Sequence, residues 1–272
     1  MTFRTEQQDA MLLEALSAAA VDERAVWAQM WARTEPGPLL EIGCGNGEML
    51  AFLAESTGPH PAVGLDTSSY LLDPRRNVAA SAPNVVLVEG DACRPPFPEG
   101  TFQSVFLNKV VHEIWADHGH RGTVAALTAC ARMLRPGGQL IIRENVRPDP
   151  RPVSIRLETE RARTQFWRFC AQFEPRAVGA RWLSSFEVEL DIGDALEFLT
   201  KKDDPNWAAE MHEPHFTFFE GEWPAVLGEH ALLSDIAIAP DELTPVPVFD
   251  EVALSWQPEP YKHVIAARKP RV

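Results

Sequence analysis

The stretch that decides the fold runs from Leu39 to Leu50 and reads Leu-Leu-Glu-Ile-Gly-Cys-Gly-Asn-Gly-Glu-Met-Leu. An apolar run ends there in three glycines at alternate positions, Gly43, Gly45 and Gly47. Glycine adopts positive φ readily and lets a ligand approach the main chain, so this pattern predicts a strand, a tight turn and a helix beside a ligand. The spacing fits neither Gly-x-Gly-x-x-Gly nor a phosphate loop, and Glu41 at the turn favours a cation over a pyrophosphate.

Three further apolar runs also end in polar residues. Residues 61–66 end in Asp66, residues 84–92 end in Gly-Asp-Ala around Asp91, and residues 102–108 end in Asn108. Asp66 lies about 20 residues beyond the turn, where a nucleotide-binding βαβ unit places a carboxylate for the ribose hydroxyls. Another run begins at residue 134 with Leu-Arg-Pro-Gly-Gly. Strands that alternate with helices predict a parallel sheet with its ligand at the carboxyl ends of the strands.

Residues 38–145 together resemble the class I S-adenosylmethionine-dependent methyltransferases, in which Glu-x-Gly-x-Gly-x-Gly is motif I. The resemblance implies S-adenosyl-L-methionine as the methyl donor and S-adenosyl-L-homocysteine as the product. It implies that Asp66 accepts from the ribose and Asp91 from the adenine amino group. The full set of cofactor-binding residues that it implies is Glu41, Gly43, Cys44, Gly45, Gly47, Asp66, Thr67, Asp91, Ala92, Asn108 and Lys109.

The fold expected from these patterns is α/β, with a doubly wound, mostly parallel, seven-stranded Rossmann-like sheet whose last strand is antiparallel. Helical periodicity over residues 5–33 predicts an N-terminal helical cap at 1–36. The cofactor-binding core follows at 37–145. A mainly helical insertion between strands five and six, with helices at 153–173 and 192–227, forms an acceptor lid at 146–228. Closing strands of the core, at 232–238 and 263–267, complete the chain at 229–272.

Candidate catalytic residues follow the fourth strand. Methyl transfer is an in-line displacement that depends chiefly on positioning, and a base is needed only where the acceptor loses a proton. His112, with an ordinary pKa of about 6.5, suits that role, and Glu113 lies beside it. The alternative is that His112 only shapes the pocket and that Glu113 forms a cap or an ion pair.

Three more residues are candidates for contact with the acceptor. Arg143 and Glu144 end the fifth strand, and strand alternation sends them in opposite directions, so one of them can meet the acceptor. Trp115, just past the catalytic candidates, completes the predicted substrate-binding set. The lid is rich in Trp and Phe, which suits a mostly apolar pocket, although core packing explains these residues equally well.

No metal site is predicted. Glu210, His212, Glu213 and His215 gather four possible ligands within six residues, but Pro214 interrupts the helix that would align them. A solvated or substrate-lining face is the favoured interpretation of this segment. The four cysteines are scattered, without Cys-x-x-Cys spacing, and are expected to be free thiols.

The charge distribution bears on the acceptor. The 272 residues carry a net charge of −14, which excludes long-range attraction to nucleic acid. Nine arginines stand against five acids between Arg143 and Arg181, so local RNA binding stays open as an alternative. Asn108 is not followed by Pro-Pro-Tyr or Pro-Pro-Phe. Such a sequence would resemble the signature of enzymes that methylate amino groups of nucleic-acid bases.

The favoured function is therefore methyl transfer to an oxygen or nitrogen of a small-molecule acceptor. RNA methylation through residues 143–181 and a non-catalytic cofactor-binding scaffold are the alternatives. The N-terminal residues lack a basic region followed by an apolar stretch, and no run approaches the length that spans a bilayer. A cytoplasmic location without a membrane partner is expected, and the oligomeric state stays open.

Overall fold

The computed structural model describes residues 23–244 and 249–271. The helix predicted over residues 5–33 is described from residue 23 onward, and residues 23–31 are helical. Its earlier part lies outside the described residues. Val26, Trp27 and Met30 are buried in one core cluster with β1 (Leu39–Ile42) and α2 (Glu48–Ser56).

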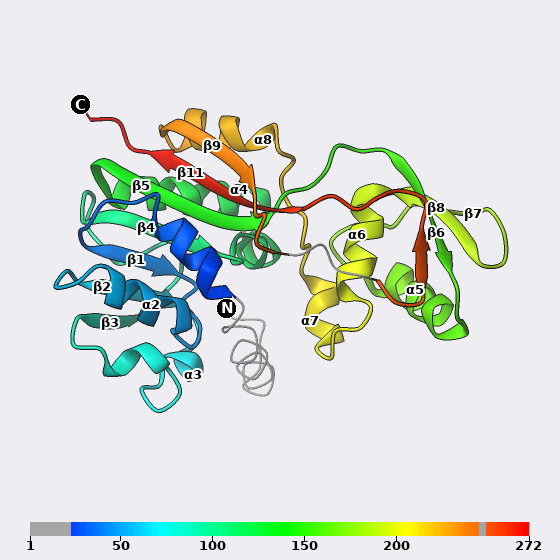
Figure 1. Cartoon of the computed structure of the whole chain (residues 1–272), viewed down its shortest axis with the longest axis horizontal. Coiled ribbons are helices and arrows are strands. Elements are labelled where there is room, and N and C mark those ends of the chain that lie inside the picture. The colour runs from blue at the N-terminus through cyan, green and yellow to red at the C-terminus, as the bar shows by residue number, and fades with distance from the viewer. Residues whose placement is uncertain (1–22, 245–248, 272) are drawn as a thin grey trace.

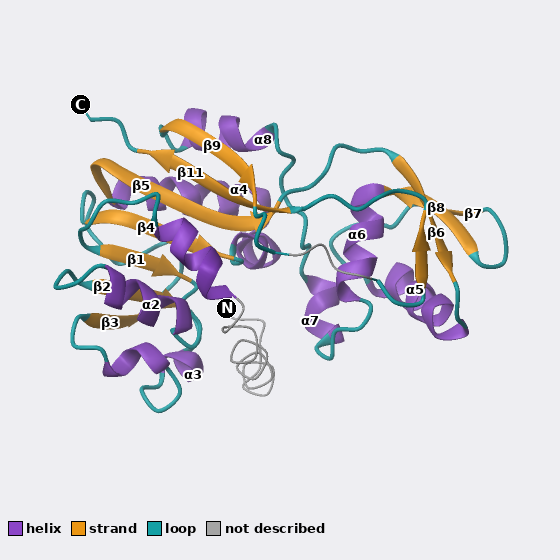
Figure 2. Cartoon of the chain, viewed as in Figure 1, coloured by secondary structure: helices purple, strands orange, loops and turns teal. Residues whose placement is uncertain are grey.

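The larger lobe is built on a sheet that, within the described residues, has seven strands in the order β3-β2-β1-β4-β5-β11-β9 (Figures 1 and 2). β1, β2 (Ala62–Asp66), β3 (Val85–Glu89), β4 (Phe102–Asn108) and β5 (Leu134–Asn145) are parallel. β11 (Lys262–Arg268) is antiparallel to β5 and to β9 (Ser234–Pro240). The predicted sheet with its antiparallel last strand is confirmed.

Helices cover this sheet and connect its strands. Besides α2, they are α3 (Ser69–Leu72), a 3₁₀ turn at Val78–Ser81 and the long α4 (Val111–Met133). α4 bends at Gly119, whose φ of 63° is not helical. Farther along the chain, α8 (Glu222–Pro224) and a π-helical turn at Ala225–His230 precede β9. Trp223 and Leu227 of this segment are buried in the same core cluster as α4.

The second lobe contains the predicted helices, and it also contains a sheet that the sequence did not predict. This antiparallel sheet has the order β10-β6-β8-β7 and combines β6 (Pro152–Leu157), β7 (Ala180–Trp182) and β8 (Glu187–Asp191) with β10 (Val252–Leu254). The helices are α5 (Glu160–Gln172), α6 (Ile192–Lys201) and α7 (Trp207–His212). Their apolar side chains form a core separate from that of the larger lobe.

Two boundary predictions were wrong for identifiable reasons. Helix was expected from residue 153, yet Val153, Ile155 and Leu157 are buried and alternate with more exposed residues, which is the two-residue period of a strand. The segment 229–272 was assigned wholly to the core. Its β10 pairs instead with β6, so the chain returns to the second lobe between the two closing strands (Figure 1).

The two lobes are connected by several passes of the chain, which lie side by side between them in Figure 1. One pass leaves the end of β5, and another enters the start of β11 at Tyr261. Among the described residues, no helix has the length and apolar character that a bilayer crossing requires.

Candidate functional site

The glycine turn lies at the carboxyl end of β1 and has the backbone that its sequence predicted. Gly43, Gly45 and Gly47 have φ values of 67°, 50° and 81°. Gly45 N donates to Asp66 Oδ2 at 2.8 Å, so the turn is tied to the end of β2. A Cβ at Gly47 would lie 2.1 Å from Asn77 Oδ1. Only glycine satisfies both the dihedral angle and the close contact there.

Glu41 is buried beneath this turn, with 3% of its surface exposed, and it lines the larger of two adjoining cavities. Burial, together with the nearby Asp66 carboxylate, raises the pKa of Glu41 well above its usual range. Among the described residues, Glu41 Oε2 has no hydrogen-bond partner. A buried carboxyl oxygen without a partner is costly, and a cation or donor bound beside it removes that cost.

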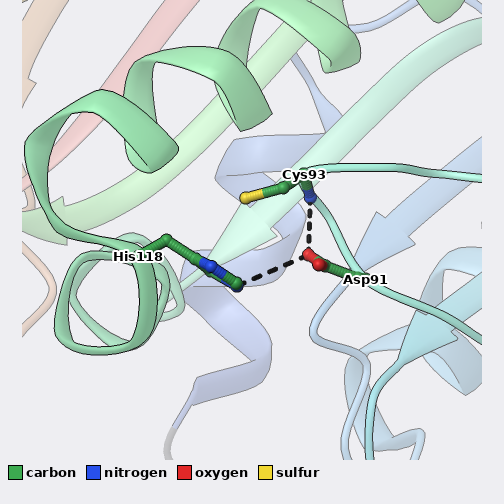
Figure 3. Close-up of side chains that lie close together, drawn as sticks. All are labelled: Asp91, Cys93 and His118. Atoms are coloured by element: carbon green, nitrogen blue, oxygen red, sulfur yellow. Dashed lines mark hydrogen bonds and ion pairs between the residues drawn. The ribbon is translucent and has the colours of Figure 1, made fainter. Parts of the chain in front are cut away.

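The smaller cavity, of about 90 Å³, lies at the ends of β2 and β3. Asp66, Thr67, Asp91 and Ala92, four of the residues predicted to bind the cofactor, line it. Figure 3 shows that Asp91 also faces two residues that the sequence did not single out. Cys93 N donates to Asp91 Oδ1 at 2.7 Å, and His118 Nε2 lies 3.6 Å from the same oxygen. Burial and the Asp91 carboxylate raise the pKa of Cys93 to about 11, which keeps this thiol protonated at neutral pH.

The larger cavity, of about 590 Å³, lies between the two lobes. From the larger lobe it is lined by predicted site residues, namely Glu41, Gly43, Cys44, Gly45, Asp66, Asn108, Lys109, His112, Glu113 and Glu144. Residues of the second lobe, among them Asp204, Glu210, Glu213, His215 and Phe249, line its other side. The structure thus brings the cofactor motifs and the catalytic candidates to one cavity.

His112 and Glu144 form a buried pair at this cavity. His112 Nδ1 lies 3.0 Å from both carboxylate oxygens of Glu144, and Asn145 N donates to Glu144 Oε1 at 2.9 Å. Burial alone would lower the pKa of His112, but the charge and hydrogen bond of Glu144 outweigh burial and raise that pKa to about 9. Because Glu144 occupies Nδ1, the Nε2 atom is the one left for chemistry.

Of the two residues that end β5, Glu144 lines the cavity and Arg143 does not. Arg143 is 1% exposed; its Nε donates to Asp241 Oδ2 at 2.8 Å and its Nη2 to Thr244 Oγ1 at 2.8 Å. Its Nη1 donates to Asn108 Oδ1 at 3.3 Å. Strand alternation sends Glu144 into the cavity and leaves Arg143 to the loop after β9.

Trp115 likewise lines neither cavity, and its ring packs edge-on against Phe218 at 5.1 Å and His120 at 5.2 Å. Trp115 follows Val111 by one helical turn of α4, and Val111 is fully buried in the core. The two side chains therefore share the core-facing side of the helix.

The four possible metal ligands of the lid do not share one set of partners, because Glu210 pairs with His215 whereas His212 and Glu213 face other residues. Glu210 Oε2 lies 2.9 Å from His215 Nε2 and accepts from Lys201 Nζ at 3.1 Å, which holds the pKa of Glu210 at about 2 against the effect of burial. His212 Nδ1 lies 2.9 Å from Glu174 Oε2. Glu213 alone reaches across the cavity, where ligand atoms of Glu213, His112 and Glu113 all lie within 4.8 Å of one another.

Lys262 is a cavity residue that sequence analysis missed. It opens β11, lines the larger cavity and lies close to Lys109, Arg143 and Glu23. Burial, reinforced by repulsion from Lys109 and Arg143, lowers the pKa of Lys262 to about 8. No motif surrounds this residue, and the pairing of β11 with β5 alone brings it to the site.

Comparison with known proteins agrees with this geometry. The family model for a methyltransferase domain matches residues 39–138. The demethylmenaquinone methyltransferase of Staphylococcus aureus is 32% identical over 110 residues, which are 40% of this chain and 43% of that protein. The chain thus spans less than half the length of the curated relatives that it matches.

Solved structures resemble the chain over most of its length. A SAM-dependent methyltransferase from Aquifex aeolicus superposes with a TM-score of 0.54 at 14% identity, covering 98% of this chain and 99% of that one. Human N-acetylserotonin methyltransferase in complex with SAM gives 0.54 at 16% identity, over 98% of this chain and 57% of that one. At these identities the likeness establishes the fold. The chain therefore has the Rossmann-like fold of these methyltransferases, and residues 39–138 match the family model for a methyltransferase domain.

Proposed function

We propose that this protein transfers a methyl group from S-adenosylmethionine to a small-molecule acceptor bound between the two lobes. The observation that carries the proposal is the shared cavity. One cavity of about 590 Å³ is lined by Glu41, by the glycine turn and by the buried pair of His112 and Glu144. A methyl donor and an acceptor could thus be held close together, which is the main requirement of an in-line displacement.

The residues present fit the cofactor. The unpartnered Glu41 Oε2 suits a cationic group, and the Asp66 carboxylate, at the end of β2, would accept from the ribose hydroxyls. Asp91 would accept from the adenine amino group, and Lys109 and Lys262 would attract a carboxylate. When bound, the cofactor supplies a methyl group activated by an adjacent sulfonium.

His112 is the proposed proton acceptor, and Glu144 is the residue that orients it. Glu144 holds the ring through Nδ1, so that Nε2 is directed away from the pair. Glu144 is itself held by the backbone N–H groups of Asn145 and His112, at 2.9 and 3.3 Å. A base fixed in this way loses little entropy when the acceptor binds.

The charge arrangement supports a small acceptor over RNA. Three arginines of residues 143–181 form close pairs with carboxylates, with distances of 2.6 Å for Arg161–Asp203, 2.8 Å for Arg176–Asp194 and 2.7 Å for Arg181–Glu189. Arginines neutralised in this way make a poor track for phosphates.

Calorimetric titration with S-adenosylmethionine tests the cofactor half of the proposal. We expect micromolar binding that Asp66→Ala weakens by at least about tenfold, an affinity change of about 1.4 kcal/mol. Glu160→Gln, on the exposed first turn of α5, serves as the control and should bind like wild type. Absence of binding, or equal binding by Asp66→Ala, would contradict the proposal. Formation of S-adenosylhomocysteine with a pool of small metabolites then distinguishes an enzyme from a cofactor-binding scaffold.

A further inference from the structure

Three side chains of different chemistry converge beside the smaller cavity, apart from the buried pair of His112 and Glu144 (Figure 3). Asp91 and Cys93 lie in the segment after β3, and His118 lies on α4. A carboxylate oxygen of Asp91, Cys93 Sγ and a ring nitrogen of His118 all lie within 4.8 Å of one another. Among the described residues there are two such groups of possible metal ligands, and only this one includes a thiol. The proposed methyl transfer gives no role to Cys93 or His118.

The backbone fixes the positions of these three residues. Asp91 Oδ1 accepts from Cys93 N at 2.7 Å, which holds the two residues in one tight turn. His118 is the last residue before Gly119, where α4 bends with a φ of 63°. On the far side of that bend, the carbonyl oxygen of Gly122 accepts from Cys93 Sγ at 3.4 Å. The turn after β3 thus lies against the bend of α4, and the three side chains meet there.

The spacing of these groups suits a tetrahedral metal ion. His118 Nε2 and Asp91 Oδ1 are 3.6 Å apart, which is too long for a hydrogen bond. Zinc forms bonds of about 2.0–2.3 Å to nitrogen, oxygen and sulfur, so neighbouring ligand atoms of a tetrahedral site are separated by about 3.3–3.6 Å. The side chains of His118 and Asp91 are 33% and 40% exposed. An ion can therefore enter from solvent, and small rotations of these side chains bring the ligand atoms to bonding distance.

The chemistry of the three groups selects the ion. A thiolate, an imidazole and a carboxylate are ligands that Zn²⁺ takes in proteins, whereas Mg²⁺ and Ca²⁺ prefer oxygen alone. The Asp91 carboxylate and the Cys93 thiolate together balance the two positive charges of Zn²⁺. In the metal-free protein the raised pKa of Cys93 keeps the thiol protonated, and coordination displaces that proton to solvent. Three protein ligands leave the fourth position of the ion open.

We infer that Asp91, Cys93 and His118 form a Zn²⁺ site, and that a bound ion and S-adenosylmethionine exclude each other. The second part rests on the proposed function, in which Asp91 accepts from the adenine amino group. Asp91 and His118 both line the smaller cavity, so the ion would border the space assigned to the adenine. An Asp91 carboxylate that coordinates Zn²⁺ is held by the ion and is not available to the amino group. Zinc would thus inhibit methyl transfer from a site that lies apart from His112.

Co²⁺ replaces Zn²⁺ as a coloured probe in the first experiment, which uses the full-length protein freed of cofactor. We expect one equivalent of Co²⁺ to bind, with the visible bands of a tetrahedral ion and the near-ultraviolet charge-transfer band of a thiolate ligand, and Zn²⁺ to displace it. Cys93→Ser should abolish the charge-transfer band, and His118→Ala should weaken Co²⁺ binding at least about tenfold. Cys170→Ser, which removes another half-buried thiol, and His230→Ala, which removes an exposed imidazole, are the controls. Thermal melting verifies that each variant is folded.

The second experiment measures the coupling between Zn²⁺ and S-adenosylhomocysteine by calorimetry. We expect saturating S-adenosylhomocysteine to weaken Zn²⁺ binding at least about tenfold, and saturating Zn²⁺ to weaken S-adenosylhomocysteine binding by the same factor, because coupling between two ligands is reciprocal. Cys93→Ser should bind S-adenosylhomocysteine like wild type and should lose the effect of Zn²⁺.

The outcomes separate this inference from the proposed function. Absence of the charge-transfer band in wild type, or a band that persists in Cys93→Ser, would overturn the zinc site. A Zn²⁺ affinity that S-adenosylhomocysteine leaves unchanged would overturn the mutual exclusion. Failure of wild type to bind S-adenosylhomocysteine would overturn the proposed function itself, whereas the Co²⁺ bands of the first experiment would still support the zinc site.

Discussion

His112 is the side chain on which the proposed chemistry most depends, and its properties come from one neighbour. A histidine in a buried site ordinarily titrates below its usual range, because burial disfavours the charged ring. The Glu144 carboxylate reverses this direction and raises the pKa of His112 to about 9. His112 is therefore protonated at neutral pH in the free protein, and it becomes a base only as the pH approaches that value.

We expect kcat/KM to rise with pH, with its midpoint near pH 9 and its plateau above that value, because the neutral ring is the form that accepts the proton. In Glu144→Gln the carboxylate that raises the pKa of His112 is gone while the burial remains. The rise should then move to lower pH, and the plateau should fall because the ring is no longer oriented. A pH profile of kcat/KM for both proteins measures this, and an unshifted midpoint would contradict the assigned role of Glu144.

Gly47 offers a second test at the scale of one residue. In Gly47→Ala the alanine would have to adopt a φ of 81°, and its Cβ would lie 2.1 Å from Asn77 Oδ1. Gly58→Ala is the matched control, because its φ is 67° but nothing lies within 4 Å of the new Cβ. We expect Gly58→Ala to lower the free energy of unfolding by about 1 kcal/mol, from backbone strain alone. Gly47→Ala should cost at least about 2 kcal/mol and also weaken cofactor binding. Urea denaturation and calorimetry measure the two effects, and equal costs would show that the contact with Asn77 is unimportant.

At the scale of elements, α6 and α7 form the side of the second lobe that faces the cavity. A buried ionic network connects these two helices. Lys201 is fully buried and contacts Glu197 at 3.6 Å, Glu210 at 3.1 Å and the backbone oxygen of Glu213 at 2.8 Å. Glu197, also fully buried, accepts from the backbone N–H groups of His215 and Phe216, each at 3.0 Å. The network thus holds the segment after α7 in the conformation that brings Glu213 to His112.

Removal of the Lys201 charge should destabilise the lobe strongly. Lys201→Met removes the buried cation that Glu197 and Glu210 share, although Arg176 stays 3.7 Å from Glu197 and His215 stays 2.9 Å from Glu210. A broken buried pair typically costs about 3–5 kcal/mol. Arg161→Met is the control, because Arg161 is exposed and its ion pairs are worth at most about 1 kcal/mol. The free energy of unfolding in urea measures both changes. A cost below about 1 kcal/mol for Lys201→Met would mean that the network does not stabilise the wall.

The patterns of individual elements were predictable to different degrees. The turn after β1 and the acids at the ends of β2 and β3 could be predicted, because each follows its strand directly in the sequence. Strand β6 was missed although its alternating apolar residues signal a strand, since arginines and the following helix obscured the change of period. The partners of Arg143 could not be predicted, because Asp241 lies 98 residues away and reaches it only through the pairing of β9, β11 and β5.

At the scale of the whole molecule, two lobes with separate cores enclose one cavity, and the chain passes between them more than once (Figure 1). The larger lobe carries the cofactor motifs, and the second lobe supplies the acids that face them. Acids outnumber basic residues by 39 to 25 over the sequence, so the acidic cavity lies within an acidic protein. A cationic ligand is attracted to such a molecule, and a polyanion is repelled.

We therefore expect weak binding of RNA at physiological salt. Fluorescence anisotropy with a labelled 20-nucleotide polyuridine should give a dissociation constant no tighter than about 10⁻⁴ M, the weak end of the range for non-specific binding. Arg161, Arg176 and Arg181 are paired with carboxylates and the net charge is −14, so little counterion release is available. Micromolar binding that falls steeply with salt, and that Arg156→Ala and Arg163→Ala reduce, would favour the RNA alternative.

The sequence by itself determined the fold of the larger lobe and the placement of the proposed cofactor-binding residues at the strand ends, because those residues follow the strands at short, regular spacings. Local spacing is enough when a parallel sheet brings the ends of its strands to one edge. Only the tertiary structure decided the acceptor side. Glu213, Lys262 and Phe249 reach the cavity from segments with no motif of their own, through strand pairing and the packing of the two lobes. Contacts of that kind depend on how whole elements pack, which no local pattern of residues records.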